Sequence, residues 1–197
     1  MTDLPVFTAA DGIATLILHE IPARGEGYIL VRGVFGTLDG LLRECANFCC
    51  GAGAQKVYAG GEADFSGYPV FARLMERQLL LPQIPETGCT VEAVTEESAF
   101  RWAERYNERF AAVPSAQSCG PFEARRLAKQ GECFFVLEDG APAGLGRVRG
   151  SRLLALASLR PGAGERTLFA LARHCGLQKI DLTCAMENTR AMAFYDR

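Results

Sequence analysis

The chain has 197 residues, of which 49% are hydrophobic and 22% charged, with a formal net charge of −2 at pH 7. This composition is typical of a globular protein with a buried core, and the length suits one large domain or two small ones. The near-neutral charge disfavours nucleic-acid and membrane partners, and no apolar run reaches the roughly 18–20 residues of a membrane span. Because Met1-Thr2-Asp3 lacks the start of a signal peptide, we expect a cytoplasmic protein.

The first third of the sequence predicts a hairpin, a helix, a strand and a second helix. Apolar β-type runs at Ile13–Ile21 and Tyr28–Phe35 flank a loop that contains proline and glycine. Thr37 is the predicted N-cap of a helix whose apolar residues follow helical spacing. A strand at Gln55–Ala59 and a helix over Pro69–Leu80 complete this part.

The segment that follows predicts a linker and then two helices. Residues 79–88 contain two prolines and few charges, which indicates a boundary between two units, 1–85 and 86–197. A strand at Thr90–Val94 precedes a helix that begins near Thr95 and continues to Phe110. A second helix, Phe122–Lys129, follows the loop Ala112–Gly120.

The last third predicts three strands, a helix, a strand and a closing helix. The strands are Cys133–Leu137, Ala143–Val148 and Arg152–Leu159, and a helical stripe then runs to Cys175. An apolar strand at Lys179–Thr183 leads to the final helix. The same order of strand, helix, strand and helix occurs in the first third. The sequence therefore predicts a partial internal repeat, with Gly-x-Gln-Lys at corresponding points of both copies (residues 53–56 and 176–179).

Eight cysteines are spread along the chain without a Cys-x-x-Cys pair, and there are two histidines, His19 and His174. Zinc sites need clustered ligands, and secreted disulfide scaffolds are usually shorter and richer in cysteine. We therefore predict no metal site and reduced thiols that pack as small apolar side chains. His174 and Cys175 are not favoured as a reactive pair, because adjacent helical residues do not face each other.

From residue 90 onward, two motifs and the order of elements resemble the GCN5-related N-acetyltransferases. One motif is the turn Gly140-x-x-x-Gly144, and the other is Asn188-x-x-Ala191-x-x-Phe194-Tyr195 directly after a strand. The resemblance implies an α/β (α+β) fold with an acyl-CoA N-acyltransferase-like mixed central sheet flanked by helices. The N-terminal third then resembles a partial, degenerate copy of strand-helix-strand-helix.

This resemblance implies an N-acetyltransferase that moves an acetyl group from acetyl-CoA to a primary amine of a small molecule or peptide. It makes Tyr195 the catalytic general acid for the CoA thiolate and gives Asn188 a hydrogen bond that positions the cofactor arm. A glycine-rich turn that enters a helix would hold the pyrophosphate. The cofactor-binding residues implied are Leu156, Ala157, Ser158, Leu159, Arg160, Gly162, Ala163, Gly164, Arg166, Thr167, Asn188 and Tyr195.

The sequence departs from the family pattern at the cofactor turn and at the general base. Pro161 supplies no N–H, and Glu165 places a negative charge where phosphates would lie. The strand Leu153–Leu159 carries no glutamate, so Glu132 or Glu138 would have to act through water. The loop Ala112–Gly120, which would form the acceptor pocket, is neutral and favours no charge class of substrate.

Two other hypotheses remain open at this stage. The chain could be a non-catalytic binding or assembly module with a degraded CoA turn, or an unrelated α/β protein. Divergence of the strand ending at Leu159 from the strand at Ile180 would favour the enzyme, because it leaves a slot for the pantetheine arm. The family continues for two strands after the tyrosine, whereas this sequence stops at Arg197. We therefore expect the N-terminal hairpin or a second subunit of a homodimer to cover the exposed sheet edge.

Overall fold

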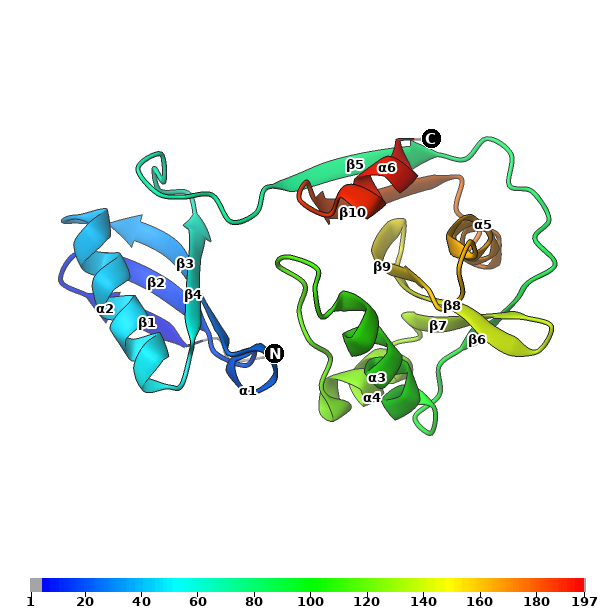
Figure 1. The fold of residues 1–197 in the computed structure, drawn as a ribbon, viewed down its shortest axis with the longest axis horizontal. Helices are drawn as coiled ribbons and strands as arrows, with labels where there is room; N and C mark the ends of the chain where they lie inside the picture. Colours follow the sequence, from blue (N-terminus) through cyan, green and yellow to red (C-terminus); the bar gives the residue numbers. More distant parts are fainter. Residues whose placement is uncertain (1–4, 197) are drawn as a thin grey trace. The chain divides into compact units, whose positions relative to one another are not determined.

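The computed structural model describes residues 5–196, and its contacts divide the chain into two units, Met1–Phe71 and Ala72–Arg197. Each unit is described by itself (Figure 1). Met1-Thr2-Asp3, on which the expected localisation rests, lies outside the described residues. No helix within residues 5–196 is long and apolar enough to cross a membrane.

The first unit is a four-stranded sheet with one long helix packed against it. Its strands are β1 (Val6–Ala9), β2 (Gly12–Ile17), β3 (Glu26–Val34) and β4 (Lys56–Gly61), in that spatial order. The predicted hairpin is confirmed, with a short helix α1 (Ile21–Arg24) in its connection. Helix α2 (Leu38–Gly51) joins β3 to β4, which run parallel. The apolar stripe of α2 packs on the sheet around Leu16, as the spacing of its residues predicts.

The second unit contains a six-stranded mixed sheet in the order β5-β10-β9-β8-β7-β6. Parallel pairing occurs between β9 and β10, and the other neighbouring strands are antiparallel. The element order predicted from residue 90 onward is confirmed. The bounds are β5 (Leu74–Leu80), β6 (Thr90–Ala93), α3 (Ala99–Phe110), α4 (Pro121–Lys129), β7 (Cys133–Glu138), β8 (Ala141–Arg149), β9 (Arg152–Ser158), α5 (Gly164–His174), β10 (Lys179–Ala185) and α6 (Thr189–Tyr195).

Helices cover both faces of this sheet. Alternate residues of β7 point to opposite faces, so that Phe134 packs in the cluster containing α5 and α6, and Phe135 packs with α3 and α4. Two glycines of β8 bring α5 close to the strand. A Cβ atom at Gly144 would lie 2.2 Å from Thr167 Oγ1, and one at Gly146 would lie 2.3 Å from a methyl group of Leu171. The mixed sheet flanked by helices confirms the predicted fold class.

The segment Pro69–Leu80 does not form the expected helix. Residues 62–73 have no regular structure, and β5 then pairs antiparallel with β10 from Leu74↔Ala185 to Leu80↔Lys179. Figure 1 shows β5 beside β10. The edge of β10 is thus covered by β5, and the expectation that the N-terminal hairpin or a second subunit covers it is wrong.

The cysteines are free and mostly buried. Within residues 5–196 all eight lack a disulfide, and no group of three or more acidic, histidine or cysteine side chains could hold a metal ion. Burial raises the pKa of Cys119 to about 11 and that of Cys133 to about 12. Such thiols stay protonated at neutral pH and act as apolar packing groups, in agreement with the prediction of structural thiols.

Candidate functional site

The strands β9 and β10 diverge after a short paired stretch. They pair at two positions, Arg152↔Asp181 and Leu153↔Leu182. The next residue, Leu154, has no partner in β8, because Leu153 pairs with Val148 and Ala155 pairs with Arg147. An extra residue of this kind is a β-bulge, which bends its strand. From Leu154 onward β9 therefore leaves β10 and stays paired with β8.

A cavity of about 540 Å³ lies beside this divergence. Its walls come from four elements that are far apart in the sequence: the end of β9, the start of α5, helix α6 and the C-terminal end of α3. The residues that line it are Glu108, Arg109, Phe110, Val113, Leu156, Ala157, Ser158, Gly162, Gly164, Glu165, Asn188, Arg190, Ala191, Ala193, Phe194 and Tyr195.

The start of α5 forms one end of the cavity and has no side-chain cap. Its N-cap residue, Ala163, offers no hydrogen-bond acceptor on its side chain. Gly162 makes the preceding turn with a φ of 75°, which favours glycine. A Cβ atom at Gly164 would lie 3.5 Å from the ring of Phe194, so α5 begins close to α6. Uncapped N–H groups at a helix N-terminus favour an anion.

The two arginines predicted to bind phosphate lie outside the lining of the cavity. Both pair with Glu138, the last residue of β7: the Arg166 Nη2 to Glu138 Oε1 distance is 3.1 Å, and the Arg160 Nη1 to Glu138 Oε2 distance is 3.7 Å. All three side chains are partly exposed. Glu138 therefore neutralises the positive charge beside the start of α5, and neither arginine contacts the cavity in this arrangement.

Three further predicted cofactor residues face the protein interior. Thr167 is fully buried, and its hydroxyl donates a hydrogen bond of 2.7 Å to the carbonyl of Ala163. Ala163 is itself buried. Leu159 packs in the cluster of α3 and α4, and its carbonyl accepts a hydrogen bond from Arg109. The predicted residues that do line the cavity are Leu156, Ala157, Ser158, Gly162, Gly164, Asn188 and Tyr195.

Asn188 and Tyr195, the two predicted catalytic residues, both line the cavity from α6. The Oδ1 atom of Asn188 accepts a hydrogen bond of 3.2 Å from the amide of Ala191, so its side chain caps α6. Tyr195 ends this helix, and burial, together with the neighbouring Cys184, raises its pKa above the ordinary value. The phenol therefore stays protonated at neutral pH.

The α3 side of the cavity was not predicted from the sequence, apart from the neighbouring loop. Phe110 was expected only as the end of a helix, and Arg109 carries no local signal that places it beside β9. The loop after α3 is fixed by Asn107, whose side chain bonds the amide of Cys119 at 2.8 Å and its carbonyl at 3.0 Å. This clamp holds Val113 and the rest of the loop near the cavity.

Glu132, the other suggested base, also lies outside the cavity lining. Its carboxylate accepts hydrogen bonds of 3.0 Å from Arg147 Nε and from Arg149 Nη2. Burial raises the pKa of Glu132, but these guanidinium groups outweigh it and hold the pKa below the ordinary value. A carboxylate bound in this way is a weak base, and we assign it a structural role.

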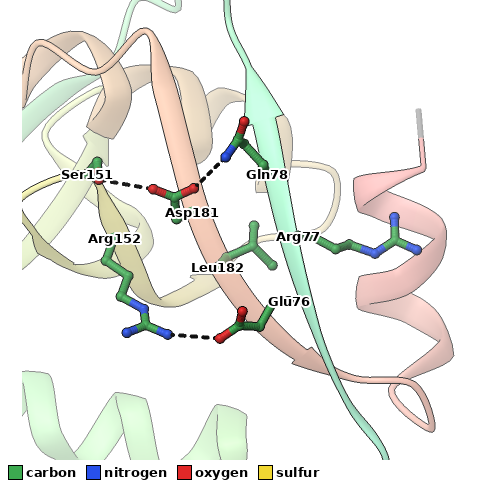
Figure 2. Close-up of a pocket in the computed structure, with 7 residues that line it drawn as sticks. All are labelled: Glu76, Arg77, Gln78, Ser151, Arg152, Asp181 and Leu182. Atoms are coloured by element: carbon green, nitrogen blue, oxygen red, sulfur yellow. Dashed lines mark hydrogen bonds and ion pairs between the residues drawn. The ribbon is translucent and has the colours of Figure 1, made fainter.

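A second, more polar hollow of about 440 Å³ lies where β9 and β10 are still paired (Figure 2). Its polar side chains bond to one another: Asp181 accepts hydrogen bonds from Gln78 at 3.0 Å and Ser151 at 3.1 Å. Arg152 pairs with Glu76 at 3.5 Å. The hollow shares no lining residue with the cavity beside α6.

Comparisons with known proteins support the fold. No protein-family model matches the sequence, and no curated protein is significantly similar to it. A GCN5-related N-acetyltransferase from Kribbella flavida matches the structure with a TM-score of 0.53 and 14% identity, over 89% of this chain and 52% of that one. A functionally unknown conserved protein from Staphylococcus epidermidis ATCC 12228 matches with a TM-score of 0.51 and 10% identity, over 94% of this chain and 85% of that one.

At these identities the likeness concerns the fold alone. The chain has a fold like that of the GCN5-related N-acetyltransferases, a general acyltransferase fold. This agrees with the resemblance of its closing motif.

Proposed function

We propose that the second unit is an N-acetyltransferase that transfers the acetyl group of acetyl-CoA to a primary amine. The observation that carries the proposal is the divergence of β9 from β10 beside an uncapped helix start, with Tyr195 in the same cavity. A slot, an anion site and a proton donor thus meet within one cavity. A small-molecule or peptide amine is the acceptor we expect, and we keep the cytoplasmic localisation as a prediction.

The chain's residues suit the two ends of CoA in different ways. The first amides of α5, from Gly164 onward, would hold the pyrophosphate, and Arg160 and Arg166 would turn from Glu138 to add positive charge. Among residues 5–196, the edge of β9 that faces away from β8 has no strand partner after Leu153. Backbone groups on this edge at residues 156–158 could bond the amides of the pantetheine arm, as an added strand would.

In the proposed reaction, acetyl-CoA supplies an activated thioester. The acceptor amine forms a bond to the acetyl carbon, and the C–S bond breaks. Tyr195 gives its hydroxyl proton to the departing sulfur, and the amine proton leaves to a base or to water. Glu108 lines the cavity from α3, and its carboxylate pairs with Arg105 at 2.9 Å; we propose that it receives this proton directly or through water.

The second candidate is a non-catalytic binding module with the same fold. Two observations favour it: Glu165 lies in the first turn of α5, and Glu138 occupies both arginines. Each lowers the affinity of this helix start for phosphate. The closing helix with Tyr195 in the cavity favours the enzyme instead.

Calorimetry with CoA and acetyl-CoA, followed by mass spectrometry of a broad amine panel, separates the two candidates. We expect saturable binding of both nucleotides and acetylation of at least one amine. The absence of binding at millimolar nucleotide would overturn the acetyltransferase and favour the module, whose helix start would no longer hold CoA. Binding without turnover of any amine would overturn the catalytic role of the cavity.

A further inference from the structure

Helix α6 is fastened at both of its ends to β5 and to the residue directly before that strand. Before the helix, the amide of Met186 donates a hydrogen bond of 2.8 Å to the carbonyl of Arg73, and the amide of Arg73 donates one of 2.9 Å to Glu187 Oε2. After the helix, Arg77 Nη1 pairs with Asp196 Oδ1. Arg73 directly precedes β5 and Arg77 lies within it, so the segment that begins this unit in the sequence provides all of these contacts.

Arg77 points away from the polar hollow formed by its neighbours on β5. It lies opposite Leu182 in the sheet, and Figure 2 shows its side chain directed toward α6 while Glu76 and Gln78 face the hollow. The side chain of Arg77 is 21% exposed. Its Nε atom is buried and has no hydrogen-bond partner among the described residues. The contact with Asp196 is therefore the polar contact that fixes this guanidinium.

The polar contacts matter because α6 packs on the core only through partly buried side chains. The helix spans Thr189–Tyr195 and contains no fully buried residue. A helix this short is unstable by itself in water. Asp196 directly follows Tyr195, so the contact of Arg77 with Asp196 acts on the end of the helix that carries the tyrosine.

We infer that Arg77 is a positioning residue: through Asp196 it holds the end of α6, and with it the hydroxyl of Tyr195, in the cavity. The inference rests on the proposed function, and it makes β5 a part of the active site. It also assigns a role to a residue outside the cavity lining, in a segment that the sequence pattern did not identify as a strand.

The kinetic test compares Arg77→Met, Asp196→Asn and the double variant. We expect each to lower kcat by about tenfold or more, because small displacements of a reacting group are costly. The double variant should lose no more than either single change, and Arg77→Lys should recover part of the activity. The dissociation constant of CoA should change by less than about threefold, since these residues do not contact the cofactor.

Two controls separate positioning from general damage. Arg152→Met removes an ion pair with Glu76 on the other face of the same strands and should leave kcat unchanged. In a Tyr195→Phe background, Arg77→Met should cause no further loss, because its effect acts through the tyrosine. A full tenfold loss in that background, or an unchanged kcat in Arg77→Met itself, would overturn the inference.

Alkylation of Cys184 tests whether Arg77 holds α6 in place, and it does not depend on enzymatic activity. Cys184 is 8% exposed and packs in the same cluster as Tyr195. Peptide mass spectrometry after iodoacetamide treatment should show several-fold faster labelling of Cys184 in Arg77→Met than in the unaltered chain. Cys133, buried on the other face, should label equally slowly in both, which shows that the unit stays folded.

The kinetic measurements and the labelling of Cys184 test different parts of the inference. Equal labelling of Cys184 in both proteins would overturn the fastening of α6 by Arg77. If the unaltered chain neither binds CoA nor acetylates an amine, the proposed function fails, and the catalytic part of the inference fails with it. The Cys184 result would still decide whether Arg77 holds the helix.

Discussion

The two units contain the same arrangement of strand, helix and parallel strand. They differ in how far the two parallel strands stay paired. In the first unit β3 pairs with β4 from Glu26↔Lys56 to Val31↔Gly61, with α2 between them in the sequence. The next residue of β3, Arg32, has no partner in β2. In the second unit β9 pairs with β10 at two positions before its own bulge at Leu154. In each unit the parallel pairing ends where the first of the two strands has a bulge. The position of the bulge therefore decides where the two parallel strands separate.

The starts of the helices α2 and α5 also differ, because α2 has a side-chain cap and α5 has none. At the start of α2, Thr37 Oγ1 accepts a hydrogen bond of 3.1 Å from Gly40, and Asp11 Oδ1 accepts one of 2.8 Å from the amide of Thr37. A carboxylate of the chain itself thus occupies the anion site of α2, whereas α5 has no such cap. The proposed CoA site therefore lies in the unit whose parallel strands diverge and whose helix start has no side-chain cap. The shared order agrees with the predicted partial repeat, which stays a prediction.

The largest expected effect concerns Tyr195, which has no counterpart described in the first unit. Tyr195→Phe removes the proton donor and should lower kcat by about 10²–10⁴-fold, the usual contribution of a general acid. The dissociation constant of CoA, measured by calorimetry, should stay within about threefold. Unchanged turnover would show that another group protonates the sulfur.

The second prediction concerns a large side chain placed in the cavity of the second unit, with a substitution in the first unit as its control. Ala157 lines the cavity after the bulge of β9, so Ala157→Trp should weaken CoA binding by at least about tenfold through steric exclusion. Val34, the last residue of β3, two residues after the bulge of that strand, is the control position. Val34→Trp should leave CoA binding unchanged, and an equal loss in both variants would contradict the assignment of the site.

Each unit also contains a buried carboxylate with a lowered pKa, Glu26 in the first and Glu132 in the second. A lowered pKa contributes stability above the ordinary value of 4.5, and this contribution is lost as the pH falls through the folded-state pKa. Glu132→Gln should therefore lower the free energy of unfolding by about 2–3 kcal/mol at pH 7.

The difference between Glu132→Gln and the unaltered chain should shrink below pH 4.5. The single tryptophan, Trp102, lies in the second unit, so urea unfolding followed by its fluorescence measures this change. A pH-independent difference would show that the charge of Glu132 is not what stabilises the unit.

The smallest effect is expected at the capped start of α2. Asp11→Ala removes a cap and should lower the stability of the first unit by about 1 kcal/mol. Because the parallel strands beside α2 remain paired, the variant should gain no CoA site. Hydrogen exchange of residues 38–51 measures the first effect, and calorimetry measures the second. A new CoA site in this variant would show that capping alone had closed the first unit.

Most of the second unit follows from local sequence patterns, whereas β5 does not. The stripes of α3 and α5 and the apolar run of β9 predict their elements, because each buries a face set by its own spacing. Residues 74–80 alternate in burial only because β10, a hundred residues later, pairs with them. A strand fixed by so distant a partner has no local signal that separates it from a helix.

The sequence predicted some residues of the candidate site and missed others. Asn188 and Tyr195 were found because one short motif carries both, and the structure brings them to one cavity. Thr167 was predicted from its place in the turn, but the direction of its side chain depends on the packing of α5 against Gly144. Arg109 comes to the site through the crossing of α3 over the sheet, which no spacing in the sequence shows.

Hydrogen exchange with and without acetyl-CoA tests the central claim most directly, because it compares both units in one sample. The account predicts slower exchange at the start of α5, residues 164–167, and in α6, with no change at the start of α2. Unchanged exchange throughout the chain at millimolar acetyl-CoA, or protection confined to residues 35–41 of the first unit, would contradict it.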